Sequence, residues 1–421
     1  MNKKVSPLLN NAKTGVASFA SSLICIAIGL VVGFVLLAVL ACITLLQKGE
    51  TFTFGTLLNT VMQTGLKPML AGGFYSKSNI MGSGVRTELL KTAPLILTGL
   101  SVAFAFKTGL FNIGAAGQYT VGAFGALVCA ILLQWPWWMC LIASAVFGAL
   151  WGAIPGIFKA YLNVNEVITS IMFNWIGLYG ANTIMYNKAN SPMYNQLTAK
   201  THAVIGKSLI PSFNVKLPSF ASGNGLEWKE YFNPMREPSV AIFIAIVVAI
   251  VIWVIISKTT FGYELKACGH NKDAAKYAGI NEKKNIVLSM VIAGALAGLG
   301  AGLYYLTGTK EWEPMNSTAL PADGFNGISV ALLASSNPIG AIFSAFFISH
   351  ISLGGTFMEA KLFPQEVADI VSGVVIYLCA FSAIFRGAVM KLFTRNDKAN
   401  VNAEPAPVTV AADAEDGKEE A

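Results

Sequence analysis

The sequence predicts an all-α, polytopic integral membrane protein. Apolar residues make up 54% of the 421 residues and charged residues only 12%, whereas a soluble domain carries about 25% charged residues. Several uninterrupted apolar runs approach or exceed the ~20 residues that an α-helix needs to cross a bilayer. Because these runs are continuous and do not alternate with polar residues, they exclude a transmembrane β-barrel.

Eight apolar runs are predicted to be full spans, and one further stretch is interrupted. The eight are Leu23–Leu46, Leu89–Phe106, Tyr119–Leu133, Trp137–Leu162, Val167–Tyr186, Val240–Ile256, Ile286–Leu306 and Val367–Phe385. The interrupted stretch, 325–351, contains the polar triplet Ser336-Asn337-Pro338, and proline favours a break there. We expect a broken or re-entrant hairpin of two short helices, which gives eight to ten crossings in total.

The orientation follows from lysines near the span ends, because cytoplasmic loops of membrane proteins carry an excess of basic residues. Segment 1–17 contains Lys3, Lys4 and Lys13 and no acid, so it is predicted to be cytoplasmic. Counting spans forward places the basic loop 258–285 in the cytoplasm and segment 188–237 outside. The net charge of +7 therefore reflects membrane orientation, and no nucleic-acid partner is expected.

The transmembrane domain is predicted to cover residues 18–390, followed by a disordered cytoplasmic tail at 391–421 that is rich in Ala, Pro and Glu. Segment 307–324 is acidic and is expected outside. Since Val367–Phe385 then returns the chain to the cytoplasm, the stretch 325–351 must leave and re-enter on one side. Irregular backbone at membrane depth is tolerated where protein or a water-filled cavity covers it, so this break indicates a pathway.

Enzymatic and metal-binding functions find no support in the residue patterns. The six cysteines include no C-x-x-C pair, and the three histidines lack ligand spacing. Residues 206–208 read "GKS", but Thr201 stands where a phosphate-binding loop has its first glycine. Neither a nucleophile–base pair nor paired acids are visible, so we expect a chain that is not an enzyme and binds no ATP.

Two groups of glycines recur at four-residue spacing, and such faces let helices pack closely in lipid. They are Gly148, Gly152 and Gly156, and Gly294, Gly298 and Gly302.

Segment 165–177 carries polar residues at helical spacing, which predicts a helix face turned into the bundle. For Asn174 on this face two interpretations stay open, a substrate path and interhelical hydrogen bonding. Glu166, near the membrane surface, is predicted to have a gating or structural role. A second polar cluster, "LFNIGAAGQYTVGA" at 110–123, lies between two apolar runs. Its glycines are predicted to break the helix and turn Asn112 and Gln118 toward a polar cavity.

The cytoplasmic loop predicts a short helix that Asn271 caps and Gly279 ends. Ala274, Ala275 and Ala278 give this helix a small, smooth face. Such a helix suits insertion into a partner's groove, although an ordinary connecting helix is the alternative.

Four ordered motifs resemble permease subunits of ABC-type nucleoside importers, a group that also imports simple sugars and branched-chain amino acids. They are "LLKTAPLILTGLSVAFAFKTGLFNIGAAGQ" (89–118), "NEVITSIMFNW" (165–175), "TTFGYELKACGHNKDAAKYAGI" (259–280) and "GFNGISVALLASSNPIGAIFSA" (324–345). Two positions depart from the family pattern, because Ala116 and Asn326 replace acidic residues. Roles that the family assigns to those acids therefore do not transfer.

The resemblance implies a subunit of the bacterial cytoplasmic membrane that binds no cofactor itself, with ATP and Mg bound by a separate ABC-type ATPase. It also implies a second related permease and a membrane-tethered substrate-binding protein, in addition to the lipid bilayer. Segment 264–280 would be the coupling helix. The residues expected to couple to the ATPase are Gly269, Asp273, Ala274, Ala275 and Gly279.

The expected substrate is a nucleoside, and the more specific prediction is a purine nucleoside. Aromatic faces suit stacking on a base, and amides suit a base edge or sugar hydroxyls. The candidates for the substrate pathway are Phe111, Asn112, Gln118, Asn174, Trp175 and Asn326. Alternatives are a simple sugar or other small polar metabolite in the same importer scheme, an ATP-independent carrier or channel, and a membrane-embedded enzyme.

Overall fold

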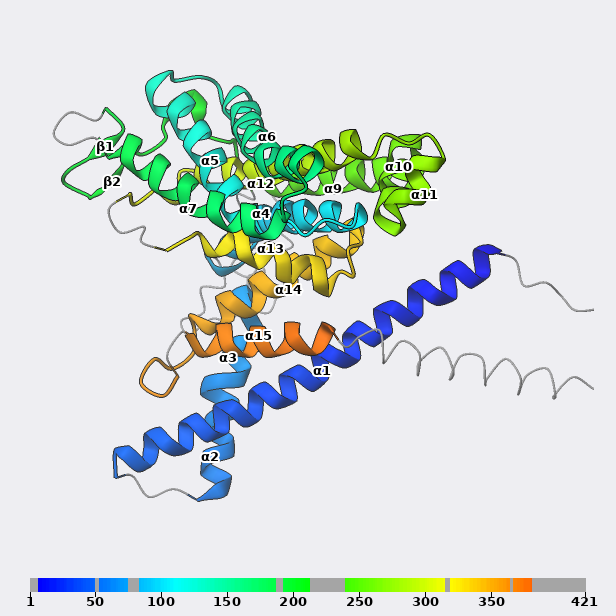
Figure 1. Ribbon diagram of the computed structural model, residues 1–421. Coiled ribbons are helices and arrows are strands. Elements are labelled where there is room, and N and C mark those ends of the chain that lie inside the picture. The colour runs from blue at the N-terminus through cyan, green and yellow to red at the C-terminus, as the bar shows by residue number, and fades with distance from the viewer. Residues whose placement is uncertain are drawn as a thin grey trace, which may run out of the picture. The chain divides into compact units, whose positions relative to one another are not determined.

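The computed structural model describes residues 7–49, 53–74, 83–186, 192–212, 239–314, 319–363 and 366–380. Within these ranges the chain is almost entirely helical, as Figure 1 shows, and one small sheet pairs β1 (Tyr194–Asn195) antiparallel with β2 (Lys200–Thr201). The all-α prediction is confirmed. The predicted tail 391–421 and most of segment 188–237 lie outside the described residues.

The helices divide between the N-terminal half of the chain and the C-terminal half. The first set is α1 (Pro7–Gln47), α2 (Phe54–Thr60), the π-helix η1 (Val61–Leu66), α3 (Lys67–Ala71), the 3-10 turn η2 (Gly72–Phe74), α4 (Ser83–Lys107), α5 (Ala115–Leu127), the π-helix η3 (Val128–Leu132), α6 (Trp137–Leu162) and α7 (Glu166–Met185). The second set is the 3-10 turn η4 (Gly206–Ser208), α9 (Val240–Lys258), α10 (Thr260–His270), α11 (Lys272–Tyr277), α12 (Glu282–Tyr305), α13 (Ala322–Leu333), α14 (Pro338–Gly355) and α15 (Glu366–Ala380).

Seven of the described helices are long and apolar enough to cross a membrane. They are Ile24–Gln47, Val85–Lys107, Ala115–Leu132, Trp137–Leu162, Val240–Lys258, Glu282–Tyr305 and Pro338–Gly355. The polytopic prediction is thus confirmed. Helix α7 coincides with a predicted span but is not among the seven, and α15 is described only as far as Ala380.

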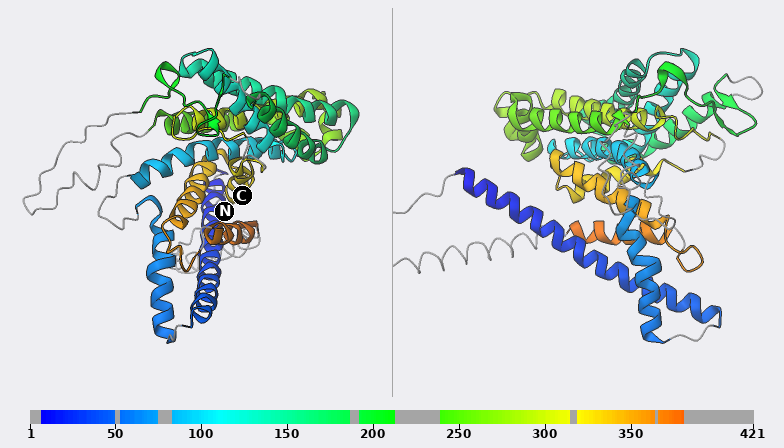
Figure 2. Two further views of the ribbon diagram at one scale, coloured as in Figure 1. Left: turned by 90° about the vertical axis from the view of Figure 1, so that its left-hand side faces the viewer. Right: turned by 180° about the vertical axis from the view of Figure 1, so that it is seen from behind.

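Residues 28–380 form one compact unit. Helix α4 lies at the centre of this unit. In its most apolar stretch of 18 residues, 83% of the residues are buried, whereas the corresponding share is 33% in α6 and in α9. In Figures 1 and 2, α4 lies between α12 on one side and α13 and α14 on the other. The outer helices keep apolar side chains exposed, as expected for surfaces that meet lipid.

The two glycine faces pack against each other, which confirms the close-packing prediction. A Cβ atom on Gly152 would lie 3.0 Å from the Cα atom of Gly294, and one on Gly298 would lie 3.0 Å from the Cα atom of Gly148. Any side chain at these positions would push α6 and α12 apart. Dispersion between backbones, which only glycine permits at this distance, therefore holds the pair together.

The predicted break before Pro338 is confirmed. Ser335 and Ser336 both adopt left-handed backbone angles, with φ of 50° and 54°, so the helix ends there. The Asn337 side chain then accepts hydrogen bonds from the backbone N–H groups of Ile339 at 3.0 Å and Gly340 at 3.3 Å. Helix α13 is short, with 12 residues, whereas α14 with 18 is longer than the hairpin prediction anticipated.

The sequence analysis missed the helix that runs from Phe54 to Ala71 through the π-turn η1. Its apolar face is buried against α1, α14 and α15, with Leu57, Val61 and Met69 in one core cluster with Phe363. Polar residues such as Gln63, Thr64 and Lys67 lower its hydropathy. The helix therefore has no continuous apolar run, and only its tertiary contacts reveal its buried face.

Candidate functional site

A polar cavity of about 640 Å³ opens beside segment 307–324, which is predicted to be extracytoplasmic, and we call it the outer cavity. Its volume falls in the range of about 300–1,000 Å³ that is common for small-molecule sites. Side chains from α4, α12, α13, α14, α15 and the loop before α13 form its walls. The charged and amide residues in its lining are Lys91, Lys310, Glu311, Glu313, Asp323, Asn326 and Asp369.

Asn326 is the predicted pathway residue that the structure places in the lining of the outer cavity. It lies on α13, one turn after Asp323, so both side chains share one helix face. The hydroxyl of Tyr119 donates to Oδ2 of Asp323 over 3.5 Å, a long contact. In the sequence, Asp323 is one acid of the acidic segment 307–324, and its position facing a cavity depends on the packing of α13.

The N-terminus of α13 presses against the N-terminus of α5, which explains the alanine at position 116. A Cβ atom on Gly324 would lie 2.9 Å from both the backbone nitrogen and the Cβ atom of Ala116. Ala116 is fully buried at this contact. A glutamate side chain there would need space that Gly324 and its helix occupy, so the loss of the acid accompanies tight packing of the two helices.

Aromatic rings form the wall of the outer cavity next to Asp323. Tyr304 and Tyr305 end α12, and the ring centroids of Tyr305 and Trp312 are 5.5 Å apart. The indole Nε1–H of Trp312 donates to Oδ1 of Asn182 at 2.8 Å, which fixes the ring. Lys310 places its ammonium 5.6 Å from the ring centre of Tyr304. Flat aromatic faces and a few convergent polar groups are typical of ligand sites.

Asn112 and Gln118 are buried and bind each other through both amide groups. Nδ2 of Asn112 donates to Oε1 of Gln118 at 2.8 Å, and Nε2 of Gln118 donates to Oδ1 of Asn112 at 3.1 Å. Nδ2 of Asn112 also donates to the hydroxyl of Ser101 on α4 at 3.1 Å. The pair thus ties the turn before α5 to α4, and neither residue lines the outer cavity. Their predicted place on a substrate pathway stays a prediction.

Asn174 makes the interhelical hydrogen bonds that were one of its two interpretations. Its Oδ1 accepts from the backbone N–H of Gly117 at 2.8 Å, and its Nδ2 donates to the carbonyl of Ile113 at 3.0 Å. These bonds join α7 to the start of α5. The structure therefore shows what the amide holds together, and a contact with substrate stays a prediction.

The two aromatic pathway candidates lie apart from the outer cavity. Phe111 stacks on Phe106, with ring centroids 5.2 Å apart. Trp175 is on the exposed face of α7, where it stacks on Tyr179 at 5.8 Å. The six predicted pathway residues consequently do not meet in one pocket, and Asn326 is the member that faces the outer cavity.

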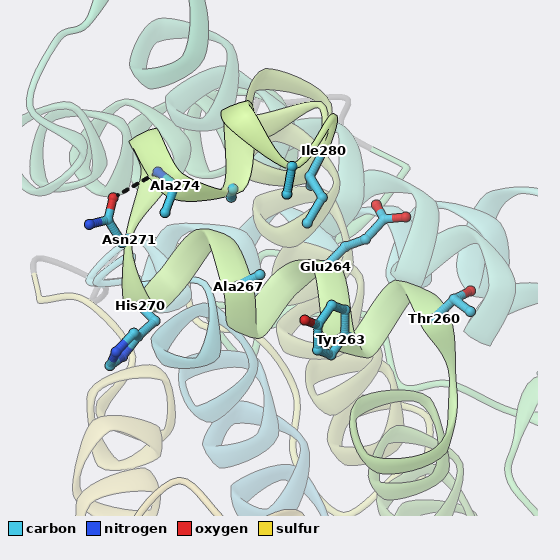
Figure 3. A pocket seen from close by; sticks show the side chains of 10 residues that line it. Thr260, Tyr263, Glu264, Ala267, His270, Asn271, Ala274 and Ile280 are labelled. Carbon is cyan, nitrogen blue, oxygen red and sulfur yellow. Dashed lines mark hydrogen bonds between the residues drawn. The ribbon is translucent and has the colours of Figure 1, made fainter.

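The loop 258–285 folds into two helices, α10 and α11, with a shallow groove of about 590 Å³ along them (Figure 3). Oδ1 of Asn271 accepts from the backbone N–H of Ala274 at 3.0 Å, and Gly279 has a φ of +80°, so the predicted cap and helix end are confirmed. Ala274 and Ala275 line the groove. Asp273 is exposed outside it.

Gly269, at the end of α10, is in backbone contact with the turn between α4 and α5. A Cβ atom on Gly269 would lie 3.0 Å from the nitrogen of Gly109, and it would collide with the carbonyl oxygen of Lys107. Gly109 itself has a φ of +69°, which a side chain would strain. Nearby, the hydroxyls of Thr108 and Ser289 are hydrogen-bonded at 2.6 Å. The loop 258–285 is therefore joined to the segment that carries Asn112 and Gln118.

Glu166 forms an ion pair with Lys159, whose Nζ lies 2.9 Å from Oε2 of the carboxylate. Burial raises the pKa of Glu166, but the hydrogen bond and charge of Lys159 outweigh it, so the pKa lies below its ordinary value. The pair closes the turn between α6 and α7 at Asn163, whose φ is +50°. The ion pair is the contact that a structural role requires, and the choice between a gating and a structural role of Glu166 stays a prediction.

A pair that no local sequence pattern indicates joins the buried Glu88 on α4 to the half-buried His350 on α14. Nδ1 of His350 lies 2.7 Å from Oε1 of Glu88, and Nε2 lies 2.8 Å from the carbonyl oxygen of Leu70. The second carboxylate oxygen accepts from the N–H of Gly73 at 2.9 Å. The pair therefore fastens the end of the missed helix to α4 and α14. Glu88 stands one residue before a predicted span and was counted outside it.

Comparisons with known proteins converge on one class of membrane protein. Residues 84–380 match the family described as branched-chain amino acid transport system / permease component. The chain is 35% identical over 328 residues to the guanosine ABC transporter permease protein NupP of Bacillus subtilis, covering 77% of this chain and 87% of that protein. It is 36% identical over 308 residues to the nucleoside ABC transporter permease protein NupB of Lactococcus lactis, covering 70% and 79%. It is 26% identical over 313 residues to the glucose ABC transporter permease protein TsgB13 of Haloferax volcanii, covering 72% and 77%.

Proposed function

The chain belongs to the permease-component family of branched-chain amino acid transport systems, and we propose that it is the membrane-spanning subunit of an ATP-driven importer of nucleosides. The observation that carries the proposal is the match to two relatives named for guanosine and for nucleosides, each at least 35% identical over more than two thirds of the chain. The matched family region, 84–380, contains both the outer cavity and the α10–α11 groove.

The subunit itself is proposed to be non-catalytic, with ATP and Mg held by a separate ABC-type ATPase. The geometry around "GKS" supports this. Gly206–Ser208 forms an isolated 3-10 turn, and the hydroxyl of Ser208 donates to the carbonyl of Trp135 at 2.6 Å. A phosphate-binding loop needs a following helix whose N–H groups face the phosphates, and residues 209–212, which the structure describes directly after this turn, are not helical.

The ATPase is proposed to bind at the α10–α11 groove. Asn285 of α12 donates to Glu264 at 3.1 Å, which anchors α10 to a membrane helix. Gly269 contacts the backbone at Gly109. A displacement of α10 therefore also moves the turn that connects α4 to α5. A backbone contact has no flexible side chain to absorb such a displacement. Gly269, Asp273, Ala274, Ala275 and Gly279 therefore keep their proposed roles in coupling.

The substrate is proposed to pass through the outer cavity, with Asn326 in direct contact with it. Asn112, Gln118 and Asn174 then act by holding the start of α5, whose residue Tyr119 reaches Asp323 in the cavity. Phe111 and Trp175 are proposed to contribute from outside the cavity in other states of the transport cycle. A second related permease and a membrane-tethered substrate-binding protein complete the assembly.

A simple sugar in the same importer scheme is the second candidate. The relative from Haloferax volcanii is named for glucose, although it is only 26% identical. An outer cavity with a carboxylate, an amide and aromatic walls would suit a sugar as well as a nucleoside.

Uptake of labelled guanosine, adenosine and glucose by cells with and without the gene tests the proposal. We expect nucleoside uptake to fall at least about tenfold without the gene in a strain that lacks other nucleoside carriers, because no other route for the substrate is then present. Loss of glucose uptake alone would favour the second candidate. Purification in mild detergent should bring an ATPase subunit with the chain, and its repeated absence would contradict the importer scheme.

A further inference from the structure

The inference below rests on the proposed function and concerns how the outer cavity recognises its substrate. Asp323 is half-buried in the first turn of α13 and lines this cavity. Among the described residues, its one recorded hydrogen-bond partner is the hydroxyl of Tyr119 at 3.5 Å. A carboxylate has two oxygens and about four positions that can accept hydrogen bonds. Most of its capacity is therefore open toward the cavity.

An acceptor in this position favours a ligand with neighbouring donors. Leaving a partly buried carboxylate without hydrogen-bond donors costs free energy. A ligand that supplies two O–H donors removes this cost and thereby binds more tightly. Vicinal hydroxyls present two donors that a single carboxylate can accept together, and acidic residues recognise the ribose of bound nucleotides in this manner.

The other walls suit a molecule that carries a sugar and a flat base and bears no negative charge. Two lysines, Lys91 and Lys310, line the cavity together with four acids, so the lining as a whole disfavours an anion such as a phosphorylated nucleoside. Tyr304 and Trp312 supply flat apolar surface close to the carboxylate. Asn326, on the same face of α13, adds a donor and an acceptor.

We propose that Asp323 is the residue that recognises the sugar, by accepting hydrogen bonds from the vicinal 2′- and 3′-hydroxyls of the ribose. Asp323 thereby determines the preference for ribonucleosides over deoxyribonucleosides. It does not distinguish guanosine from adenosine, because the two share one sugar.

The test compares uptake of guanosine with 2′-deoxyguanosine, and of adenosine with 2′-deoxyadenosine, in cells that carry the complete transporter. The wild-type permease should prefer each ribonucleoside by about tenfold, as expected for one charge-assisted hydrogen bond. The variant Asp323→Asn should reduce both ratios to about two- to threefold, since the amide keeps one acceptor but loses the charge. The binding protein is the same in every strain, so a changed ratio reports the permease.

Glu359→Gln provides the matched control, because it makes the same acid-to-amide change in the loop after α14, away from the lining of the outer cavity. This variant should keep both ratios. If Asp323→Asn is not retained in the membrane, Asp323→Glu is measured in its place, because it keeps the charge and moves the carboxylate by one methylene. The ratios of ribonucleoside to deoxyribonucleoside uptake should also decrease in this variant.

The outcomes separate this inference from the proposed function. Nucleoside uptake with the same ribose preference in wild type and in the Asp323 variants would overturn the inference and leave the function standing. A change that affects guanosine relative to adenosine, with the deoxy ratios unaltered, would mean that Asp323 contacts the base and would likewise overturn it. Absence of any nucleoside uptake by the wild-type transporter would instead contradict the proposed function.

Discussion

The outer cavity and the α10–α11 groove differ in the groups that form them. The cavity is lined by charged, amide and aromatic side chains contributed by five helices and a loop. The groove is lined largely by small and apolar residues of two short helices (Figure 3). It adjoins the backbone contact between Gly269 and Gly109. Side-chain chemistry suits selection of a ligand, whereas a preformed backbone surface suits transmission of a movement.

The largest effect should come from the backbone contact of α10. Gly269→Leu would insert a side chain against the backbone at Lys107 and Gly109, and overpacking of this kind costs about 1–3 kcal/mol. We expect uptake and substrate-stimulated ATP hydrolysis to fall about tenfold or more, with the protein still inserted. Gly180→Leu is the matched control, because no atom lies within 4 Å of a Cβ at that position. Equal activity of the two variants would contradict the proposal that the backbone contact of α10 transmits a movement.

Substitutions of Asn174 and of Asn326 should have different effects, the first on stability and the second on transport. Asn174→Leu leaves the N–H of Gly117 and the carbonyl of Ile113 without partners, which costs about 1–3 kcal/mol for each buried group. We expect a lower Tm for this variant in detergent. Asn326→Leu should keep the wild-type Tm and lose uptake, because its side chain faces the cavity. Thermal unfolding and uptake measured on both variants check this expectation. A wild-type Tm for Asn174→Leu together with a lowered Tm for Asn326→Leu would contradict the structural role of Asn174 and the substrate contact of Asn326.

Cysteine labelling sharpens the description of the groove. Burial raises the pKa of the Cys268 thiol, an effect that the amide of Asn285 partly offsets, so little thiolate exists at neutral pH. We expect slow reaction of Cys268 with a maleimide, at a rate that increases as the pH rises toward that pKa. Ala274→Cys, exposed in the groove, should react at least about tenfold faster and become protected when the ATPase is present. Labelling that the ATPase leaves unchanged would argue against docking at this groove.

The smallest effect is expected at the turn between α6 and α7. Glu166→Gln removes the ion pair with Lys159 and should lower stability by about 0.5–1 kcal/mol near pH 7. Because the pKa of Glu166 in the folded protein lies below its ordinary value of 4.5, the pair stabilises the fold above that pH. This stabilisation is lost as the pH falls through the folded pKa. Unfolding curves of wild type and variant should therefore converge in acid, and a constant difference would exclude the ion pair as the cause.

Local properties of the chain explain what could be predicted from it. Span positions follow from the length of apolar runs, and the breaks at Asn271, Gly279 and Asn337 follow from residues that cap or end helices. The glycine faces of α6 and α12 were visible because helical periodicity places residues four apart on one side. Each of these signals involves neighbours within one or two turns, so no knowledge of the tertiary structure was required.

The outer cavity and the buried polar pairs depended on the tertiary structure. Glu88 and His350 are 262 residues apart, and Tyr119 and Asp323 are 204 apart, so no local pattern indicates that they meet. The helix of Phe54–Ala71 escaped prediction because it buries one face against other helices without being apolar throughout. The sequence by itself determined that the chain has several helices long and apolar enough to cross a membrane, since transfer into lipid depends on composition and length. Packing decided which polar side chains face a cavity and which bind each other, because that choice depends on the neighbours that the fold supplies.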